Sequence, residues 1–241
     1  MDVLVFDVWG DYAHFKKFYT TSSPLTFSFP PPSTVKGMLG AIIGVNKDEY
    51  LEKFSKGKCK IGVKILNPVH KVRLGLNHIN TKGGYWIPCK KNNHEARTQI
   101  RTEFLRAPKY RIYVFHKEKD IVGKLYNNLI KHESFYTLSL GLSELLANYE
   151  FKGVFRFEEK NNELDENIEI GTVIPVNLIK PYGIEFEEDK KYYKERIPIE
   201  MNSDRVVEVY EDVVFEAEGR PVKANVYKYW EDSNGERITF F

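Results

Sequence analysis

The sequence predicts an α+β fold whose elements follow in the order strand, helix, strand, strand, helix, strand. Short apolar runs rich in β-branched residues predict the strands, and two segments with apolar residues at helical spacing predict the helices. Hydrophobic residues make up 42% of the 241 residues and aromatic residues 14%, which is enough to build a core. This order of elements is the ferredoxin-like order.

The first strand and the first helix have the clearest patterns. Residues 3–9 form an apolar run typical of a buried strand. Three prolines at 30–32 precede a helix with apolar residues at 35, 38, 39, 42 and 43. A second stripe of small residues holds glycines at 37, 40 and 44. Since a helical glycine costs about 1 kcal/mol relative to alanine, something approaches closely there, either the sheet or a nucleic-acid backbone.

The remaining elements complete the order. Residues 59–67 and 69–76 have strand patterns, and 100–105 with 109–115 form the return strand, broken at Pro108. The polar, aperiodic stretch between them, residues 77–99, is long enough to suggest a functional loop. Residues 120–132 are a helix and 152–157 a strand. We therefore expect a first domain over 1–157, an acidic linker over 158–170 and a small β-rich C-terminal domain over 171–241, with a hairpin formed by 206–217 and 222–229.

Composition and motifs narrow the classes of function. Acidic residues stand where a secretory signal would be basic, and no apolar run approaches the roughly 18 residues of a membrane span. We expect a cytoplasmic protein with no membrane contact. Cys59 and Cys89 give neither a disulfide framework nor a zinc spacing. The sequence has no phosphate loop, nucleophile elbow or paired-carboxylate motif, so we expect no metal and no cofactor.

Charge is divided unevenly along the chain. Residues 1–157 hold 25 basic and 13 acidic side chains, whereas residues 158–241 hold 11 and 21. This division predicts that the first part meets a polyanion, and the alternative is a drift of surface charge without function. Residues 64–117 are the richest segment, with twelve basic and two acidic residues and with Tyr85, Trp86, Phe104 and Tyr110 among them. Cations for phosphates and rings for bases suit a single-stranded nucleic acid, although a solvated basic face fits as well.

The start of the first helix also suggests an anion site. Ser33 or Thr34 can cap the helix, and its first-turn amides favour an anion. Lys36 opposes the helix dipole there unless a phosphate lies nearby, or else it extends into water. We expect Lys16 and Lys17 of the preceding segment beside the same ligand.

Four stretches resemble the motifs of a known family. FDVWG (6–10), FKKFYTTSS (15–23) and SFPPPSTVKGMLGAIIG (28–44) resemble the N-terminal signature of the CRISPR-associated Cas-five family, in the RAMP superfamily, most closely its type I-B branch. FYTLSLGLSE (135–144) is similar to a second motif of the family. The resemblance implies a ferredoxin-like domain with a β-hairpin thumb, placed here at 77–99, and a smaller C-terminal β domain.

The resemblance also implies a role. It implies a non-catalytic subunit of a type I Cascade surveillance complex in antiviral defence, which holds the 5′ handle of the CRISPR RNA. The expected neighbours are a backbone (Cas-seven-like) subunit, a large (Cas-eight-like) subunit and nearby target DNA. The expected RNA-binding residues are Lys16, Lys17, Ser33, Thr34, Lys36, Gly37, Lys71, Arg73, His78, Lys82, Lys90, Lys91, Arg97, Arg101, Arg106 and Arg111. Tyr85 and Trp86 are expected to contact a base or a neighbouring subunit.

Two alternative functions stay open. The first is a metal-independent endoribonuclease of the same fold, because histidine with lysine can drive general acid/base attack by a 2′-hydroxyl. One branch of the family uses a tyrosine, a lysine and a histidine, for which Tyr19, Lys117 and His116 are loose candidates. The second alternative is a protein-interaction module whose basic patch binds an acidic partner.

Overall fold

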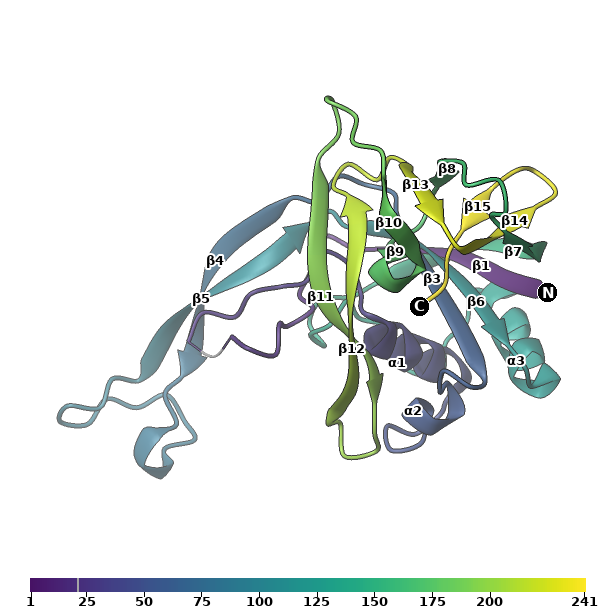
Figure 1. Cartoon of the computed structure of the whole chain (residues 1–241). Coiled ribbons are helices and arrows are strands. Elements are labelled where there is room, and N and C mark those ends of the chain that lie inside the picture. The colour runs from purple at the N-terminus through teal and green to yellow at the C-terminus, as the bar shows by residue number, and fades with distance from the viewer. Residues whose placement is uncertain (21) are drawn as a thin grey trace.

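Strands dominate the computed structural model, which describes residues 1–20 and 22–241 (Figure 1). Thr21, within the FKKFYTTSS stretch, lies outside the described residues. The main sheet is antiparallel and six-stranded, in the order β15-β14-β7-β1-β6-β3. Its strands are β1 (Asp2–Trp9), β3 (Cys59–Ile65), β6 (Lys109–His116), β7 (Asn148–Asn161), β14 (Lys228–Asp232) and β15 (Arg237–Ile238).

Two long helices connect these strands, and a short one follows the first. They are α1 (Pro32–Ile43), α2 (Tyr50–Lys53) and α3 (Lys119–Ile130), so both predicted helices are present. Pro32 begins α1, where a proline loses no helical hydrogen bond. The predicted cap by Ser33 or Thr34 is wrong, because both residues already lie in the first turn and the backbone of Pro31 occupies the cap position without a side-chain bond.

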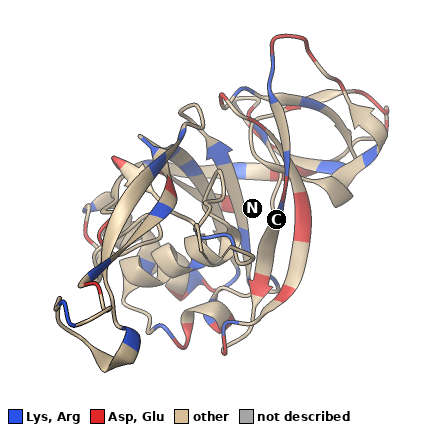
Figure 2. Cartoon of the chain, turned by 90° about the vertical axis from the view of Figure 1, so that its left-hand side faces the viewer, with Lys and Arg blue, Asp and Glu red and all other residues tan. Residues whose placement is uncertain are grey.

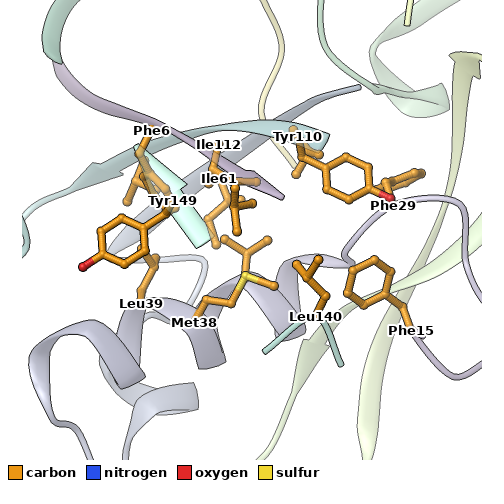
Figure 3. Close-up of a cluster of buried hydrophobic side chains, with 14 of the residues drawn as sticks. Phe6, Phe15, Phe29, Met38, Leu39, Ile61, Tyr110, Ile112, Leu140 and Tyr149 are labelled. Atoms are coloured by element: carbon orange, nitrogen blue, oxygen red, sulfur yellow. The ribbon is translucent and has the colours of Figure 1, made fainter. Parts of the chain in front are cut away.

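The core forms on both faces of the main sheet. On one face, side chains of the strands meet α1, and Figure 3 shows Phe6, Ile61 and Ile112 above Met38 and Leu39. Phe15 and Phe29 from the aromatic stretch and Leu140 from the second motif join the same cluster. The other face carries a smaller cluster of Val3, Val5, Tyr113, Phe157, Trp230, Ile238 and Phe240. Because both faces are covered, β1 is buried almost throughout, as its continuous apolar run predicts.

A long hairpin leaves the body between β3 and β6 (Figure 1). It consists of β4 (Lys71–Ile79) and β5 (Arg97–Arg106), with the short turn η1 (Lys82–Gly84) near its tip and β2 (Tyr12–Ala13) paired at its base. Pairing runs from Lys71 opposite Leu105 to Ile79 opposite Arg97. The thumb predicted at 77–99 is therefore too short, since the segments at 69–76 and 100–105 belong to this hairpin instead of the main sheet.

The C-terminal strands are β8 (Ile168–Ile170), β9 (Ile174–Pro175), β10 (Ile179–Ile184), β11 (Tyr192–Met201), β12 (Val207–Glu216) and β13 (Val222–Val226), with the turn η2 (Val176–Leu178) after β9. They form two three-stranded sheets, β10-β13-β8 and β11-β12-β9. The hairpin predicted from 206–217 and 222–229 is wrong, because β12 and β13 pair with different strands. Gly219, at φ 82°, sits against the carbonyl of Ile65, and the chain changes sheets at this turn.

The predicted domain boundary also needs correction. β7 continues to Asn161 and pairs there with β14, and residues 168–170 are β8, so residues 158–170 are no linker. Ile197, Ile199, Val213 and Phe215 join the same core cluster as α1. Within the C-terminal part, only the cluster of Ile168, Ile170, Ile174, Val222, Ala224 and Val226 forms a small core of its own. The alternating apolar residues of β11 and β12 supply this continuity, which a composition shift does not reveal.

Candidate nucleic-acid interface

A groove of about 410 Å³ opens beside the N-terminal half of α1. Four residues predicted to bind RNA line it, namely Lys16, Ser33, Thr34 and Gly37. Its other walls are His14, Phe15, Met38, Ala41, Tyr50, Met201 and Arg205, together with Thr137, Leu138, Ser139, Gly141 and Leu142 of the second motif. Five residues with a side-chain hydroxyl group and two cations therefore line one open groove.

A close backbone contact joins the two motif regions in this groove. The backbone N–H of His14 donates to the carbonyl of Leu140 at 3.0 Å. Gly141 has φ 102°, and a Cβ at this position would overlap the carbonyl oxygen of His14. Only glycine fits there. The segment before α1 and the 135–144 stretch are far apart in sequence. This contact joins them into one wall of the groove.

The glycines of α1 divide into two roles. A Cβ at Gly40 would lie 3.0 Å from Cβ of Tyr50, and Gly44 ends the helix at φ 73° under the ring of Phe135. Packing explains both of these. Gly37 lines the groove, and a Cβ there would meet only the Tyr50 ring, at 3.8 Å. Of these three glycines, Gly37 is the one that leaves room for the backbone of a ligand to come close.

His14 is a groove residue that the sequence analysis missed. Its ring is buried, tilts against Phe104 with centroids 5.5 Å apart, and has Nδ1 2.7 Å from the carbonyl oxygen of Glu103. Because a carbonyl oxygen only accepts, Nδ1 carries the proton in this bond. The imidazole is therefore fixed in orientation. A lone histidine in an aromatic stretch gives little signal in the sequence.

Arg205 is the second residue that the sequence analysis missed. It lies in the turn between β11 and β12 at φ 62°, where its N–H donates to the carbonyl of Asn202 at 2.9 Å. A non-glycine residue in this region is uncommon and is worth a functional explanation. Because the C-terminal part is acidic in composition, the sequence gave no reason to expect that it contributes a cation to this groove.

The hairpin has one basic and one apolar face. Opposite residues of an antiparallel pair share a face, so the register puts Lys71, Arg73, Arg101 and Arg97 on one side. Val72, Leu74, Leu76 and Ile100 take the other side, together with His78. Figure 1 shows that this strand pair stands away from the body, and Figure 2 shows basic residues along it. Arg106 falls on the opposite side from Arg101 by strand alternation, so it does not continue the basic stripe.

The hairpin tip exposes both cations and an aromatic ring. Lys82, Lys90 and Lys91 are exposed, and Lys90 pairs with Glu95 at 3.2 Å near the surface. Trp86 is 79% exposed. Tyr85 is not free in the same way, because its ring packs at a tilt against His94 with centroids 4.5 Å apart.

The sequence and the fold of this chain are similar to those of known proteins. Residues 3–133, more than half of the chain, match the model of the family described as CRISPR-associated protein (Cas_Cas5). The chain belongs to the Cas-five family. No curated protein matches it. Among solved structures, it is similar to a CRISPR protein from Archaeoglobus fulgidus, at 19% identity over 99% of this chain and 98% of that chain, with a TM-score of 0.56. A chain of a CRISPR RNA-guided surveillance complex is 15% identical over 91% of each chain, with a TM-score of 0.52. These likenesses show a shared fold.

Several cations expected to bind RNA are neutralised within this Cas-five chain. Lys36 has a side chain only 3% exposed and donates to Glu200 of β11 at 2.7 Å. Lys17 pairs with Glu195 of β11 at 3.2 Å. Lys71 donates to the Thr26 carbonyl at 3.1 Å and lies 3.5 Å from Glu195. The prediction that Lys36 and Lys17 face a phosphate is contradicted by these partners, and Lys71 is only partly available.

Arg111 is likewise a structural cation. It lies in β6 of the main sheet and binds Asp7 of β1 with two bonds, at 2.7 and 3.2 Å. The bond to Asp7 is the main cause that raises the pKa of Arg111 above its ordinary value. Arg111 therefore belongs to the main sheet and not to the β4–β5 hairpin. Part of the charge imbalance between the two halves is therefore neutralised inside the molecule, because carboxylates of β11 pair with lysines of the first part.

The loose catalytic candidates do not form a site around His116. This histidine is buried, its Nε2 lies 3.0 Å from the Lys53 carbonyl, and its Nδ1 accepts the N–H of Glu118 at 3.0 Å. Both ring nitrogens are occupied, so His116 holds the end of β6 against α2. Tyr19 and Lys117 are exposed.

Over residues 1–20 and 22–241, no group of three or more histidine, cysteine, aspartate or glutamate side chains is arranged to hold a metal ion. Within the same ranges, no helix has the length and apolar character needed to cross a membrane.

Proposed function

We propose that this Cas-five chain is a non-catalytic subunit of a type I Cascade surveillance complex and grips the 5′ handle of the CRISPR RNA. The groove beside α1 carries the proposal. It joins two family motifs around hydroxyl groups, a glycine without a packing role, Lys16 and Arg205. Hydroxyls and cations bind phosphate oxygens, and a glycine lets a backbone come close.

The hairpin supports the same function. Its basic face offers Arg97 and Arg101 along a line of phosphates, with Arg73 beside its partner Glu103 at 3.6 Å. Trp86 at the tip offers a ring for a base or a neighbouring subunit. We assign the order β7-β1-β6-β3, connected through α1 and α3, to the ferredoxin-like arrangement, with the hairpin as its thumb.

The proposed assembly supplies the remaining contacts. A backbone (Cas-seven-like) subunit and a large (Cas-eight-like) subunit would cover exposed apolar residues, such as Leu74 on the hairpin and Phe135 with Leu146 beside the groove. The complex would act near target DNA in antiviral defence in the cytoplasm. A type I-B setting is part of this proposal.

An RNA-binding measurement tests the groove. Fluorescence anisotropy of a labelled RNA with the repeat-derived 5′ handle should show tighter binding than a scrambled RNA of equal length. Replacing Lys16 and Arg205 together by glutamine should weaken binding by about tenfold or more, since two phosphate contacts are lost, and should flatten the salt dependence. Lys124→Gln, on exposed α3, is the matched control. Unchanged affinity in the double variant would contradict the proposal.

One observation keeps an endoribonuclease activity as a second candidate. His14 lies in the groove beside Lys16, and histidine with lysine can serve as acid and base for attack by a 2′-hydroxyl. Incubation of the chain with repeat RNA in EDTA decides between binding and cleavage. Site-specific cleavage that His14→Gln abolishes, and that a 2′-deoxy nucleotide at the cut blocks, would establish the enzyme.

A module that binds an acidic protein makes a different prediction. Such a partner would compete with the handle RNA in the same anisotropy assay without preference for RNA sequence. Sequence preference of the chain for the handle would argue against this third possibility.

A further inference from the structure

A second hollow, of about 210 Å³, lies between the start of β3 and the C-terminal strands. It shares no lining residue with the groove beside α1. Three lysines line it, Lys56, Lys60 and Lys228, together with Glu211 and Trp230. Asn177, Pro175, Leu178, Phe240 and Phe241 complete the wall. Two separate stretches of the chain, around residues 56–60 and at residue 228, thus bring three cations to one small site.

The lysines are crowded and poorly neutralised. Nζ of Lys60 lies 4.6 Å from the centre of the Trp230 ring, and Nζ of Lys228 lies 5.5 Å from the same ring. Glu159 is the carboxylate beside Lys60, at 3.8 Å, and the ion pairs among residues 1–20 and 22–241 include neither Lys56 nor Lys228. Burial lowers the pKa of Lys60, Lys228 acts in the same direction, and Glu159 opposes them. An anion bound here would relieve this repulsion.

Glu211 contributes a buried hydrogen-bond acceptor to the same pocket. Its Oε1 is buried and has no hydrogen-bond partner in the described part of the chain. Burial raises the pKa of this carboxyl, while Lys56 and the side chain of Asn177 act against that change. A buried acceptor without a partner is costly. The site therefore calls for a hydrogen-bond donor as well as an anion.

We propose that this pocket binds a ribose phosphate, with the lysines on the phosphate and Glu211 accepting a bond from a ribose hydroxyl. The phosphate brings one negative charge as a diester or up to about two as a monoester, and a sugar hydroxyl lies beside it, within the size of the site. Inorganic phosphate satisfies the lysines only. The buried Trp230 ring leaves no face for a base, so a base would extend outside.

Calorimetry of the full chain with ribose 5-phosphate tests the pocket. We expect saturable binding with a Kd on the order of 1 mM, weaker binding of inorganic phosphate and none of ribose. Lys228→Gln should weaken ribose 5-phosphate binding by about fivefold or more, the loss of one charge-assisted contact. Lys56→Gln should act in the same direction, and Lys124→Gln should change nothing.

Three results would contradict the proposal that this pocket binds a ribose phosphate. They are absence of saturable binding, equal affinity for inorganic phosphate, and unchanged binding in both lysine variants. Thermal midpoints of all variants establish that each is folded. Because the probe is a small molecule, these results do not depend on whether the groove binds RNA.

The ribose phosphate can come from an RNA backbone or from a free nucleotide, and only the first source rests on the proposed function. If RNA supplies it, saturating handle RNA should displace ribose 5-phosphate, and Lys228→Gln should weaken RNA binding. If a free nucleotide supplies it, ribose 5-phosphate should bind equally well to the RNA-loaded chain. Either result upholds the pocket. Failure of RNA binding in the groove variants with this pocket intact would concern the proposed function alone.

Discussion

At the residue scale, three glycines show how backbone space is used in this chain. Gly141 is required by a positive φ and by the carbonyl of His14, Gly40 by the side chain of Tyr50, and Gly37 by neither. The first two can be explained by folding alone. Packing does not require glycine at position 37, whereas the proposed approach of the RNA backbone does, and this makes Gly37 a sharp probe of the groove.

Gly37→Ala should therefore separate stability from binding. The added methyl group meets only the Tyr50 ring at 3.8 Å, so the helix should gain roughly 0.5–1 kcal/mol in free energy of unfolding. RNA affinity should fall, because the methyl group stands where the RNA backbone approaches. Urea unfolding and anisotropy measure the two effects.

Gly123→Ala in α3 is the matched control, since nothing lies within 4 Å of its Cβ position. It should gain similar stability and keep full RNA affinity. A Gly37→Ala variant that binds RNA as well as Gly123→Ala does would remove the close approach from the proposal.

Gly141→Ala should damage the fold itself. The positive φ and the overlap with the His14 carbonyl should together lower the free energy of unfolding by at least about 3 kcal/mol. Gly235→Ala shares the positive φ, 79°, but meets nothing within 4 Å, and should lower it by only about 1 kcal/mol. Equal losses in urea unfolding would mean that backbone conformation, not the His14 contact, demands glycine.

At the element scale, the outer end of the β4–β5 hairpin contributes no residue to the hydrophobic core. Its tip, residues 80–96, exposes Trp86 and Ile87 and is held by local bonds such as Asn80 to the Glu95 carbonyl. The hairpin base does belong to the body, through Leu105 and Phe104. Removal of the tip should thus spare the fold and remove binding surface.

Deletion of residues 82–91 should leave the thermal midpoint unchanged and weaken retention of guide RNA in the complex. Within the tip, Trp86→Ala should cost about 1–3 kcal/mol of RNA binding if the ring stacks on a base. Ile87→Ala, 70% exposed, is the control and should have little effect. A deletion that unfolds the chain would place the tip in the core and contradict its assignment as a thumb.

At the scale of the whole molecule, ion pairs hold the two halves together. Glu195 of β11 accepts bonds from Lys17 and from the side chain and backbone of Ser28, and Glu200 accepts the buried Lys36. These contacts fix the segment before α1, and α1 itself, on the β11–β12 hairpin that also carries Arg205. The groove is therefore built by both halves.

Glu200→Gln should be strongly destabilising, because it leaves the Lys36 ammonium buried without a carboxylate. Loss of one partner of such a pair costs about 3–5 kcal/mol in free energy of unfolding. Glu118→Gln breaks an exposed pair with Lys58 and should cost no more than about 1 kcal/mol. Denaturant unfolding compares them, and a small effect of Glu200→Gln would show that Lys36 reaches water or another anion.

The sequence by itself determined the elements whose signals are local. The apolar run of β1, the proline start and apolar stripe of α1 and the pattern of α3 identified those elements, and the short motifs identified the family, because period and turn chemistry act over a few residues. Only the tertiary structure decided how far the hairpin extends, that the C-terminal strands share the main core, and which cations remain free. Lys16 and Lys17 are neighbours with similar surroundings in sequence, yet one lines the groove and the other meets Glu195, 178 residues away. Long-range pairing of charges and strands depends on where the folded chain brings distant residues together, and no local pattern records it.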